Sequence, residues 1–245
     1  MATTVKNKLN SLYTRLTPGE PLTSVDLAAL GISADLAVHY VRAGWLLRLA
    51  RGVYCRPNDT VALYPSLRLL ARGVAGLHVG GKSALDWHGI RQYVAQRPEL
   101  HLYGWASARM PAWFVARFPA QYRRKRLFAE PSDALLHVAP FENRNDTPPV
   151  SAPERALLEM LSEVGLRQPL QEAREIVESA YSLRADVLGD LLQRCVSVKT
   201  VRLCLRLGRD AGAPWAAKLD PTALPTGSAK PWVSRSPDGL LVLKP

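Results

Sequence analysis

Cysteine and long apolar runs are both scarce in this chain of 245 residues. The cysteines are an odd number without CxxC spacing, which argues against a disulfide framework and against a cysteine zinc site; they are Cys55, Cys195 and Cys204. No apolar run approaches the roughly 18 residues that a membrane-spanning helix needs, and residues 1–16 lack the apolar centre of a signal peptide. We therefore expect a cytoplasmic protein without a membrane partner, with its cysteines buried as small hydrophobic side chains.

Residues with catalytic or metal-binding spacing are missing as well. The histidines form no HxxxH or HxH pair, and no Glu-x-Lys of the kind used by nucleases lies on a candidate strand. Ser83, Asp86 and His88 lie on one short predicted helix, without the strand-to-helix turn that presents a nucleophilic serine. We therefore predict no catalytic residue, no bound metal and no cofactor.

Acidic residues are few in the first half of the chain. The formal net charge is +11, from 32 Lys and Arg against 21 Asp and Glu. Residues 1–60 hold 7 basic and 4 acidic residues and residues 61–130 hold 11 and 3, whereas residues 131–245 hold 14 of each. A positive field confined to one half of the chain fits a polyanionic partner such as DNA. A basic surface that serves solubility alone is the alternative.

Two short helices are predicted between residues 22 and 44. Thr23 or Ser24 caps the first, which ends near Gly31, because glycine favours the positive φ of a helix end. Ser33 caps the second, which ends at Gly44. The apolar positions of the first helix recur at helical spacing and are Val25, Leu27, Ala28 and Leu30. The inward stripe of the second helix consists of Leu36, Ala37, Tyr40 and Val41.

A hairpin is predicted directly after the second helix. The β-prone runs 45–49 and 53–55 flank a short turn that contains Gly52. Helix, turn, helix and hairpin in this order predict a winged helix-turn-helix, whose second helix enters the major groove of DNA.

Nine residues of this region are candidates for contact with DNA. Arg42 at the end of the second helix, Arg48 on the first wing strand and Arg51 at the wing turn are placed to meet phosphates or the minor groove. The other candidates stand at the start of the first helix or on the outward face of the second, and they are Ser24, Ser33, Ala34, Asp35, Val38 and His39. Base edges would lie against that outward face, and Asp35 can accept a hydrogen bond from a cytosine amino group.

Four stretches resemble segments of one known family. Two lie in the predicted winged helix, LNSLYTRLTPGEPLTSVDLAALGIS at 9–33 and YVRAGWLLRLARGVYCRP at 40–57, and two lie later, HVGGKSALDWHGI at 78–90 and VSAPERALLEML at 150–161. The family is AbiEi, the antitoxins of bacterial abortive-infection type IV toxin–antitoxin systems. In one respect the chain departs from it: the second helix opens with Ala34-Asp35, where such recognition helices usually open with a basic or long polar residue.

The resemblance implies a function in phage defence with two parts. The winged helix would bind inverted repeats in its own promoter and repress it, and the C-terminal domain would counter a co-encoded nucleotidyltransferase-like toxin without a stable complex. Two alternatives stay open. One is a nucleic-acid-processing enzyme that uses the winged helix for targeting, and the other is a plain transcriptional regulator with a ligand-sensing C-terminal domain.

The segment after the wing changes from helical to β-prone patterns. Helices are predicted over 65–75 and 83–88, and a small, mainly antiparallel sheet is predicted from the short runs 100–103, 113–118, 122–128 and 135–138. The basic tract within it consists of Arg123, Arg124, Lys125 and Arg126. Because four successive charges cannot all be buried, the tract is expected to be solvated, either as an additional nucleic-acid contact or as a plain charged sheet edge.

Residues after a linker-like break at Thr147-Pro148-Pro149 are predicted to be mostly helical. A capping box at Ser151–Glu154 opens the first helix, and others follow over 169–181, 184–195 and 198–208. An irregular stretch over 213–231 leads to a terminal hairpin. The fold class is therefore α+β, with a further helix over Val5–Leu16 at the start.

The expected domain layout has two parts. A winged helix-turn-helix covers residues 1–60, and an α+β domain covers residues 61–245. The second domain is sheet-rich over 61–147 and helical over 150–212, and it ends in a hairpin over 230–245.

The stretch GLHVGGKS at residues 76–83 fits the phosphate-loop pattern G-x-x-x-x-G-K-[ST] letter for letter. A phosphate loop also needs a buried strand before it, whereas the residues before Gly76 have helical spacing. We interpret the stretch as a glycine-rich turn into the following helix and predict no nucleotide binding there.

Overall fold

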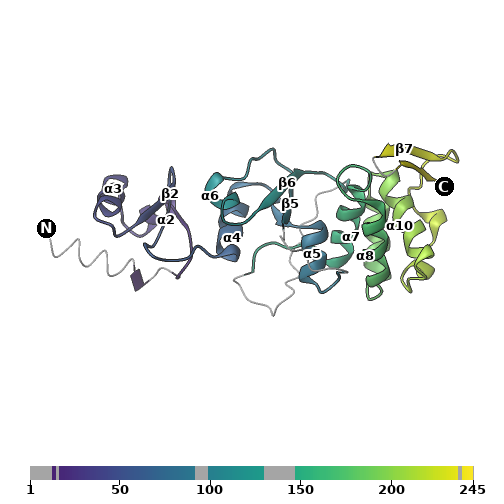
Figure 1. The fold of residues 1–245 in the computed structure, drawn as a ribbon, viewed down its shortest axis with the longest axis horizontal. Helices are drawn as coiled ribbons and strands as arrows, with labels where there is room; N and C mark the ends of the chain where they lie inside the picture. Colours follow the sequence, from purple (N-terminus) through teal and green to yellow (C-terminus); the bar gives the residue numbers. More distant parts are fainter. Residues whose placement is uncertain (1–12, 15–16, 92–98, 130–146, 237–238, 245) are drawn as a thin grey trace.

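The computed structural model describes residues 13–14, 17–91, 99–129, 147–236 and 239–244. The chain forms an elongated body, with the N-terminal part at one end and the C-terminus at the other (Figure 1). Among the described helices, none is long and apolar enough to cross a membrane. The helix predicted over Val5–Leu16 falls outside the described residues, apart from Tyr13 and Thr14.

Residues 22–55 form the unit that we call the winged module. Its elements are β1 (Leu22–Thr23), α2 (Ser24–Ala29), α3 (Ala34–Arg42), β2 (Leu47–Ala50) and β3 (Val53–Cys55). Both helices and the hairpin lie where the sequence predicts them. Strand β1 was not predicted; it pairs antiparallel with β3 and completes a sheet of order β1-β3-β2.

The winged module has a hydrophobic cluster of its own. Its buried members are Leu22, Leu27, Ile32, Ala37, Tyr40, Leu46 and Tyr54. Gly31 and Gly44 have φ of 75° and 74°, so both helices end where glycine accommodates the left-handed backbone. Val25 is 77% exposed, so the buried face of α2 is narrower than its apolar spacing predicts.

The middle of the chain contains a three-stranded sheet with three helices. These elements are α4 (Leu63–Gly73), β4 (His78–Val79), α5 (Gly81–Trp87), β5 (Leu100–Gly104), α6 (Ala112–Val115) and β6 (Ala120–Arg124). Strand β5 lies in the centre, antiparallel to β4 and parallel to β6. Helices α4 and α5 each begin two residues earlier than predicted.

The strand predicted over 113–118 is wrong, because this segment forms α6. Pro111 is the N-cap of the helix, and the adjacent rings of Trp113 and Phe114 are both buried, whereas successive side chains of a strand point to opposite faces. The strand predicted over 135–138 lies outside the described residues.

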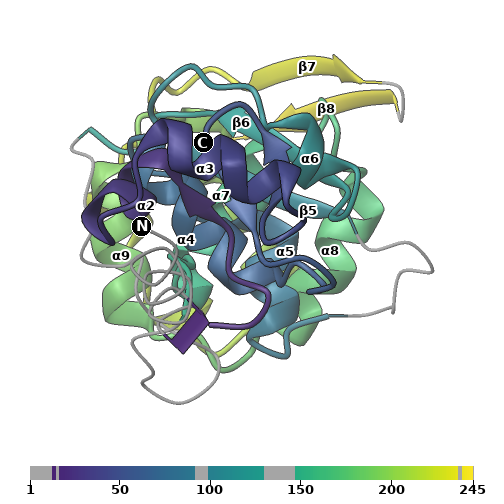
Figure 2. The ribbon, with the colours of Figure 1, turned by 90° about the vertical axis from the view of Figure 1, so that its left-hand side faces the viewer.

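Four helices form the described C-terminal half, as predicted. They are α7 (Pro153–Ser162), α8 (Leu170–Ser179), α9 (Ala185–Arg194) and α10 (Val198–Asp210). Nearly all residues of α7 are buried, because α5, α8, α9 and α10 pack around it. Figure 2 looks along the long axis, with α2 and α3 in front of this bundle.

The capping box predicted for α7 is wrong. Ala152 is the N-cap and makes no side-chain cap hydrogen bond. The Ser151 hydroxyl instead donates to Glu159 Oε2 at 2.8 Å, and the Glu154 carboxylate binds Arg184 at 2.9 Å. The local pattern assigns Ser151 and Glu154 to the helix cap, but both side chains bind partners farther along the sequence instead.

A second hydrophobic cluster consists of buried residues that contact one another and lie between Cys55 and Leu243 in the sequence. The predicted linker-like break at 147–149 is wrong, since Pro148 is buried and Val150 forms a bridge with Val79 of β4. The cysteines are buried and free, as expected.

The chain ends in two short 3-10 helices and a hairpin. They are η2 (Ala216–Lys218), η3 (Pro221–Ala223), β7 (Trp232–Ser236) and β8 (Gly239–Leu243). Strands β7 and β8 are antiparallel, so the terminal hairpin is confirmed, and with it the α+β fold class.

Candidate nucleic-acid interface

Helix α2 is fixed at its start by a capping box. The Thr23 hydroxyl accepts from the Asp26 amide at 3.2 Å, and the Asp26 carboxylate accepts from the Thr23 amide at 2.7 Å. Arg72 of α4 also binds Asp26, at 2.9 Å. Burial raises the pKa of Asp26, but the hydrogen bonds from Thr23 and Arg72 outweigh it and hold the pKa below its ordinary value. Asp26 thus orders α2 and also ties the winged module to α4.

Helix α3 lies near one end of the molecule (Figures 1 and 2), and one of its faces is exposed. The Ser33 hydroxyl caps it by accepting from the Leu36 amide. Its exposed residues, together with this cap, are the predicted base-contact residues Ser33, Ala34, Asp35, Val38 and His39, followed by Arg42. Ala37 and Tyr40 are buried on the opposite side. The inward and outward faces of α3 therefore match the prediction.

Aromatic rings hold α3 against the segment that leads into the wing. Tyr40 and Trp45 lie 5.5 Å apart, and the ring of His39 meets Trp45 edge-on at 6.2 Å. Tyr54 of β3 is 8% exposed and belongs to the same cluster. The side chain of exposed His39 therefore lies against Trp45.

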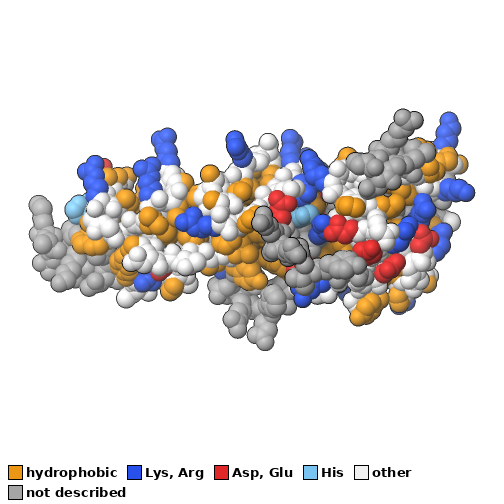
Figure 3. Space-filling view, in the orientation of Figure 1, with side chains coloured by type: hydrophobic (Ala, Val, Ile, Leu, Met, Phe, Trp, Pro, Cys, Tyr) orange, Lys and Arg blue, Asp and Glu red, His pale blue; other side chains and the backbone are white. Residues whose placement is uncertain are grey.

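The candidate residues Ser24, Arg48 and Arg51 lie at or near the turn of the wing. The Ser24 amide donates to Gly52 O at 2.9 Å, so the start of α2 rests on the wing turn. Arg48 donates from Nε to Ala50 O at 3.3 Å, and both arginines are exposed. Gly52 has φ of 72°, which the tight turn requires. Figure 3 shows Lys and Arg side chains standing along the edge of the molecule above α3 and the wing.

The basic tract at 123–126 divides into two pairs. Arg123 is buried and lies 3.3 Å from Glu163, and Lys125 binds the same carboxylate at 2.6 Å. Burial raises the pKa of Glu163, but Lys125 and Arg123 outweigh that effect and lower it. Arg124 and Arg126 are exposed. The expectation that all four charges are solvated is therefore wrong, because Glu163, far away in sequence, forms ion pairs with the two inward ones.

The glycine-rich stretch at 76–83, which we call the Gly loop, encloses a carboxylate of the protein itself. Helix α4 precedes it, as expected, and the short strand β4 lies inside the pattern rather than before it. Glu159 of α7 accepts from the Gly81 amide at 3.1 Å and from Arg155 Nε at 2.9 Å. A Cβ at Gly80 would overlap the Glu159 carboxylate, so the space that a phosphate would need is taken.

His78 and Ser151 complete the surroundings of Glu159. His78 Nε2 lies 2.9 Å from Glu159 Oε1, and its Nδ1 lies 2.7 Å from Gly76 O. Both ring nitrogens therefore lie within hydrogen-bond distance of an oxygen atom. Burial raises the pKa of Glu159, but His78 and Arg155 outweigh it and lower the pKa to about 2.

The remaining residues of the Gly loop and its helix also have structural partners. Lys82 binds Glu172 at 2.9 Å, and the Ser83 hydroxyl accepts from the His101 amide at 2.9 Å. His88 Nε2 lies 2.9 Å from Ser151 O, and Asp86 binds Arg91. Ser83, Asp86 and His88 are therefore not brought together as a hydrolytic triad.

An exposed helix beside a two-stranded wing defines a winged helix-turn-helix protein. Family models cover almost the whole chain: residues 5–96 match the N-terminal domain of the AbiEi antitoxin transcriptional regulators, and residues 97–244 match the transcriptional regulator, AbiEi antitoxin, of type IV toxin–antitoxin systems. The chain belongs to this family of antitoxin regulators.

The fold is similar to that of a solved structure. The crystal structure of the RV2827C protein from Mycobacterium tuberculosis has a TM-score of 0.56 and 18% identity, over 94% of this chain and 89% of that chain. No curated protein matches the sequence.

Proposed function

We propose that the chain is a DNA-binding autorepressor and an antitoxin with two separable parts. Residues 1–60 would bind inverted repeats in its own promoter, and residues 61–245 would counter a co-encoded nucleotidyltransferase-like toxin in the cytoplasm, without a stable complex and without catalysis. Family membership supports the regulatory and antitoxin roles. The observation that carries the DNA-binding part is the exposed face of α3 beside the exposed arginines of the wing.

The roles of the residues follow from charge and exposure. Arg42, Arg48 and Arg51 would bind phosphates and set the register on the duplex. Asp35 and His39 would face base edges in the major groove, where Asp35 accepts from a cytosine amino group. Asp35 also lies in the first turn of α3. Its carboxylate there interacts favourably with the helix dipole and stabilises the helix, whether or not DNA is bound.

The basic surface extends beyond the winged module to the exposed half of the tract. Residues 100–129 hold six basic residues and no acidic one, and Figure 3 shows Lys and Arg side chains above α6 and β6 on the same edge as those above the wing. We include Arg124 and Arg126 as additional phosphate contacts, and we exclude Arg123 and Lys125, which Glu163 holds.

The salt dependence of DNA binding tests the interface. Replacing Arg48 and Arg51 with alanine should weaken binding to every duplex and reduce the slope of log affinity against log salt by roughly two, about one for each lost phosphate contact. Arg194→Ala is a control, because Arg194 is an exposed arginine of α9, far from the wing in the sequence. An unchanged slope in the double variant would exclude the wing from the interface.

Sequence preference tests the base-contact face of α3. Asp35→Ala and His39→Ala should change the ranking of operator variants and leave the salt slope unchanged, because neither residue binds phosphate in this proposal. Binding-site selection from a random duplex pool measures the ranking. The same selected sequence for both variants and the unaltered protein would contradict base readout by α3.

A further inference from the structure

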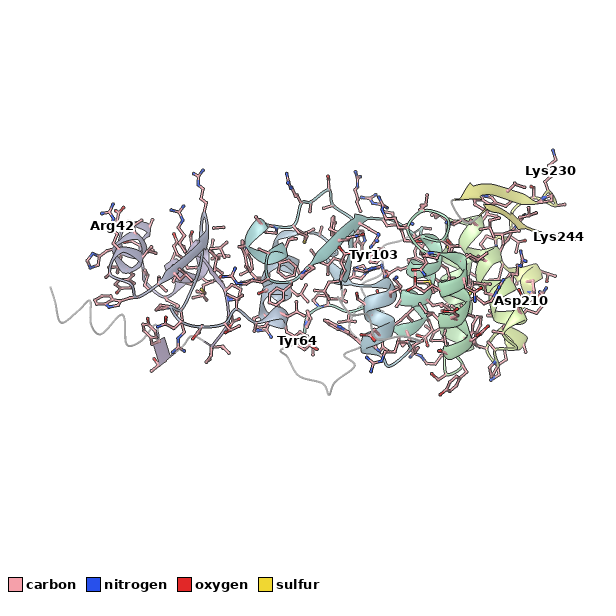
Figure 4. The ribbon with its side chains drawn as sticks, viewed as in Figure 1. Arg42, Tyr64, Tyr103, Asp210, Lys230 and Lys244 are labelled. Atoms are coloured by element: carbon pink, nitrogen blue, oxygen red, sulfur yellow. The ribbon has the colours of Figure 1, made fainter. Side chains whose placement is uncertain are left out.

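A cavity lies at the end of the molecule opposite to the winged module. Its volume is about 430 Å³, within the range of small-molecule pockets, roughly 300–1,000 Å³. Helix α10, η3 and β8 enclose it, and its wall includes Arg202, Leu205, Arg206, Arg209, Val242 and Lys244. Figure 4 shows Lys244 and Asp210 at this end, far from Arg42 of α3.

The lining of this cavity, which we call the α10 cavity, is strongly positive. Arg202, Arg206 and Arg209 follow one another at spacings of four and three residues, so they share one face of α10. Within the described part of the chain, no acidic residue belongs to the lining. Asp210 lies nearby, 3.6 Å from Arg206, and compensates part of the charge.

The buried cation of the α10 cavity is held by backbone carbonyls. Arg202 is 3% exposed, and its guanidinium donates to the carbonyl oxygens of Thr226, Lys230, Ser228 and Leu243. Carbonyl dipoles orient a guanidinium but do not cancel its charge. Arg202 therefore fixes the terminal segment and adds a full positive charge beneath the cavity.

The α10 cavity combines this charge with apolar surface. Its lining includes Leu205, which is 8% exposed, and half-buried Val242, whereas Arg209 and Lys244 in the same lining are exposed. Cations beside an apolar wall suit an anion with an apolar or planar part, since guanidinium groups bind phosphate oxygens bidentately. We propose that the α10 cavity binds a small phosphate-bearing organic anion of the nucleotide class.

This proposal assigns nucleotide binding to the α10 cavity and not to the Gly loop. The sequence places a phosphate-loop pattern at 76–83, but Glu159 fills that loop and Lys82 is paired with Glu172. Any nucleotide that the protein binds should therefore depend on α10 and not on Lys82. The proposal does not depend on the DNA-binding role, because the cavity lies at the other end of the molecule.

Titration calorimetry of the full chain with ATP tests the proposal at about 0.15 M salt. We expect saturable one-to-one binding, weakened at least about tenfold in the double variant Arg206→Ala with Arg209→Ala and also in Lys244→Ala, because each change removes a charge-assisted contact. Lys82→Ala should bind as the unaltered protein does. Adenosine, which lacks phosphate, should not bind, and inorganic triphosphate should bind more weakly than ATP because it leaves the apolar wall uncovered.

Three results would overturn the proposal. The first is no saturable ATP binding by the unaltered protein, and the second is binding that is lost in Lys82→Ala and kept in the α10 variants. The third is displacement of ATP by a random-sequence duplex, which would make the cavity a nucleic-acid backbone contact. Circular dichroism melts of each variant check that folding is kept, and Arg202 is left unchanged because it holds the terminal hairpin.

Discussion

The Glu159 carboxylate offers the most direct test of how the Gly loop is held. In Glu159→Gln the side chain keeps its shape but loses its charge, and one of its two acceptor oxygens becomes an NH₂ donor. That donor would face groups that already donate, from Gly81, Ser151, His78 and Arg155. Breaking a buried, fully hydrogen-bonded charge pair from one side costs about 3–5 kcal/mol.

The pKa of Glu159 indicates the same direction. It falls from an ordinary value of 4.5 to about 2, because the effects of His78 and Arg155 exceed that of burial. The folded protein therefore favours the charged form of this carboxylate. Because the folded pKa is the lower one, the contribution of this charge to stability is fully present above pH 4.5. It disappears as the pH falls toward 2.

Urea denaturation of Glu159→Gln and the unaltered protein measures the effect. We expect a loss of about 3–5 kcal/mol in the free energy of unfolding near neutral pH, and a smaller difference between the two proteins at each step below pH 4.5. Glu172→Gln is the control: its partner Lys82 and Glu172 itself are partly exposed, so the change should cost at most about 1 kcal/mol. If the two proteins have the same free energy of unfolding near neutral pH, or if their difference is equal at every pH, the charge of Glu159 does not stabilise the Gly loop.

Two further substitutions test packing. Tyr54→Ala should lower stability by about 3–5 kcal/mol in thermal melts, because the ring is 8% exposed in the core of the winged module; an unchanged melting temperature would mean that the ring contributes little to that core. Gly76→Ala should lower the melting temperature more than Gly89→Ala does. Both glycines have positive φ, but a Cβ at Gly76 would overlap the Trp105 ring, whereas the space at Gly89 is open; equal losses would contradict close packing at Gly76.

The winged module was predictable because its signals are local. The caps at Thr23 and Ser33 and the glycines that end both helices act within a few residues, and the period of α3 separates its exposed face from its buried one. Strand β1 was not predicted because two residues are too few to show the alternation of a strand. Only their pairing with β3 makes them a strand.

The second part of the molecule was less predictable because its polar contacts are distant in sequence. Ser151 and Glu154 have the spacing of a capping box, yet Ser151 forms a hydrogen bond with Glu159 and Glu154 forms an ion pair with Arg184. The tract at 123–126 is uniform in sequence, and only Glu163 decides which of its charges turn inward. For the α10 cavity a local signal existed, since arginines at 202, 206 and 209 lie on one helical face. That spacing alone does not reveal that η3 and β8 enclose it.

The separation of repression from toxin protection depends on whether residues 61–245 fold without the winged module. Polar contacts join the two parts: Arg72 with Asp26, Arg68 with Glu20, and the Ala62 amide with Gly19 O. Partly exposed ion pairs of this kind contribute about 0–1 kcal/mol each. Apart from Cys55, the buried members of the larger hydrophobic cluster start at Val61, although Leu49, Ala50 and Val53 of the wing pack against it.

The fragment should therefore fold, and it should melt below the full chain because buried Cys55 of that cluster is lost with the wing. Under the proposed function, the fragment expressed with the co-encoded toxin should protect cells and should not repress a reporter gene placed behind the promoter, because α3 and the wing are absent. The full chain with Arg48→Ala and Arg51→Ala is the matched control: it keeps Cys55 and should also protect without repressing. If a well-folded fragment fails to protect while this control protects, toxin protection needs the winged module itself and not its contact with DNA, and the division at residue 60 is wrong.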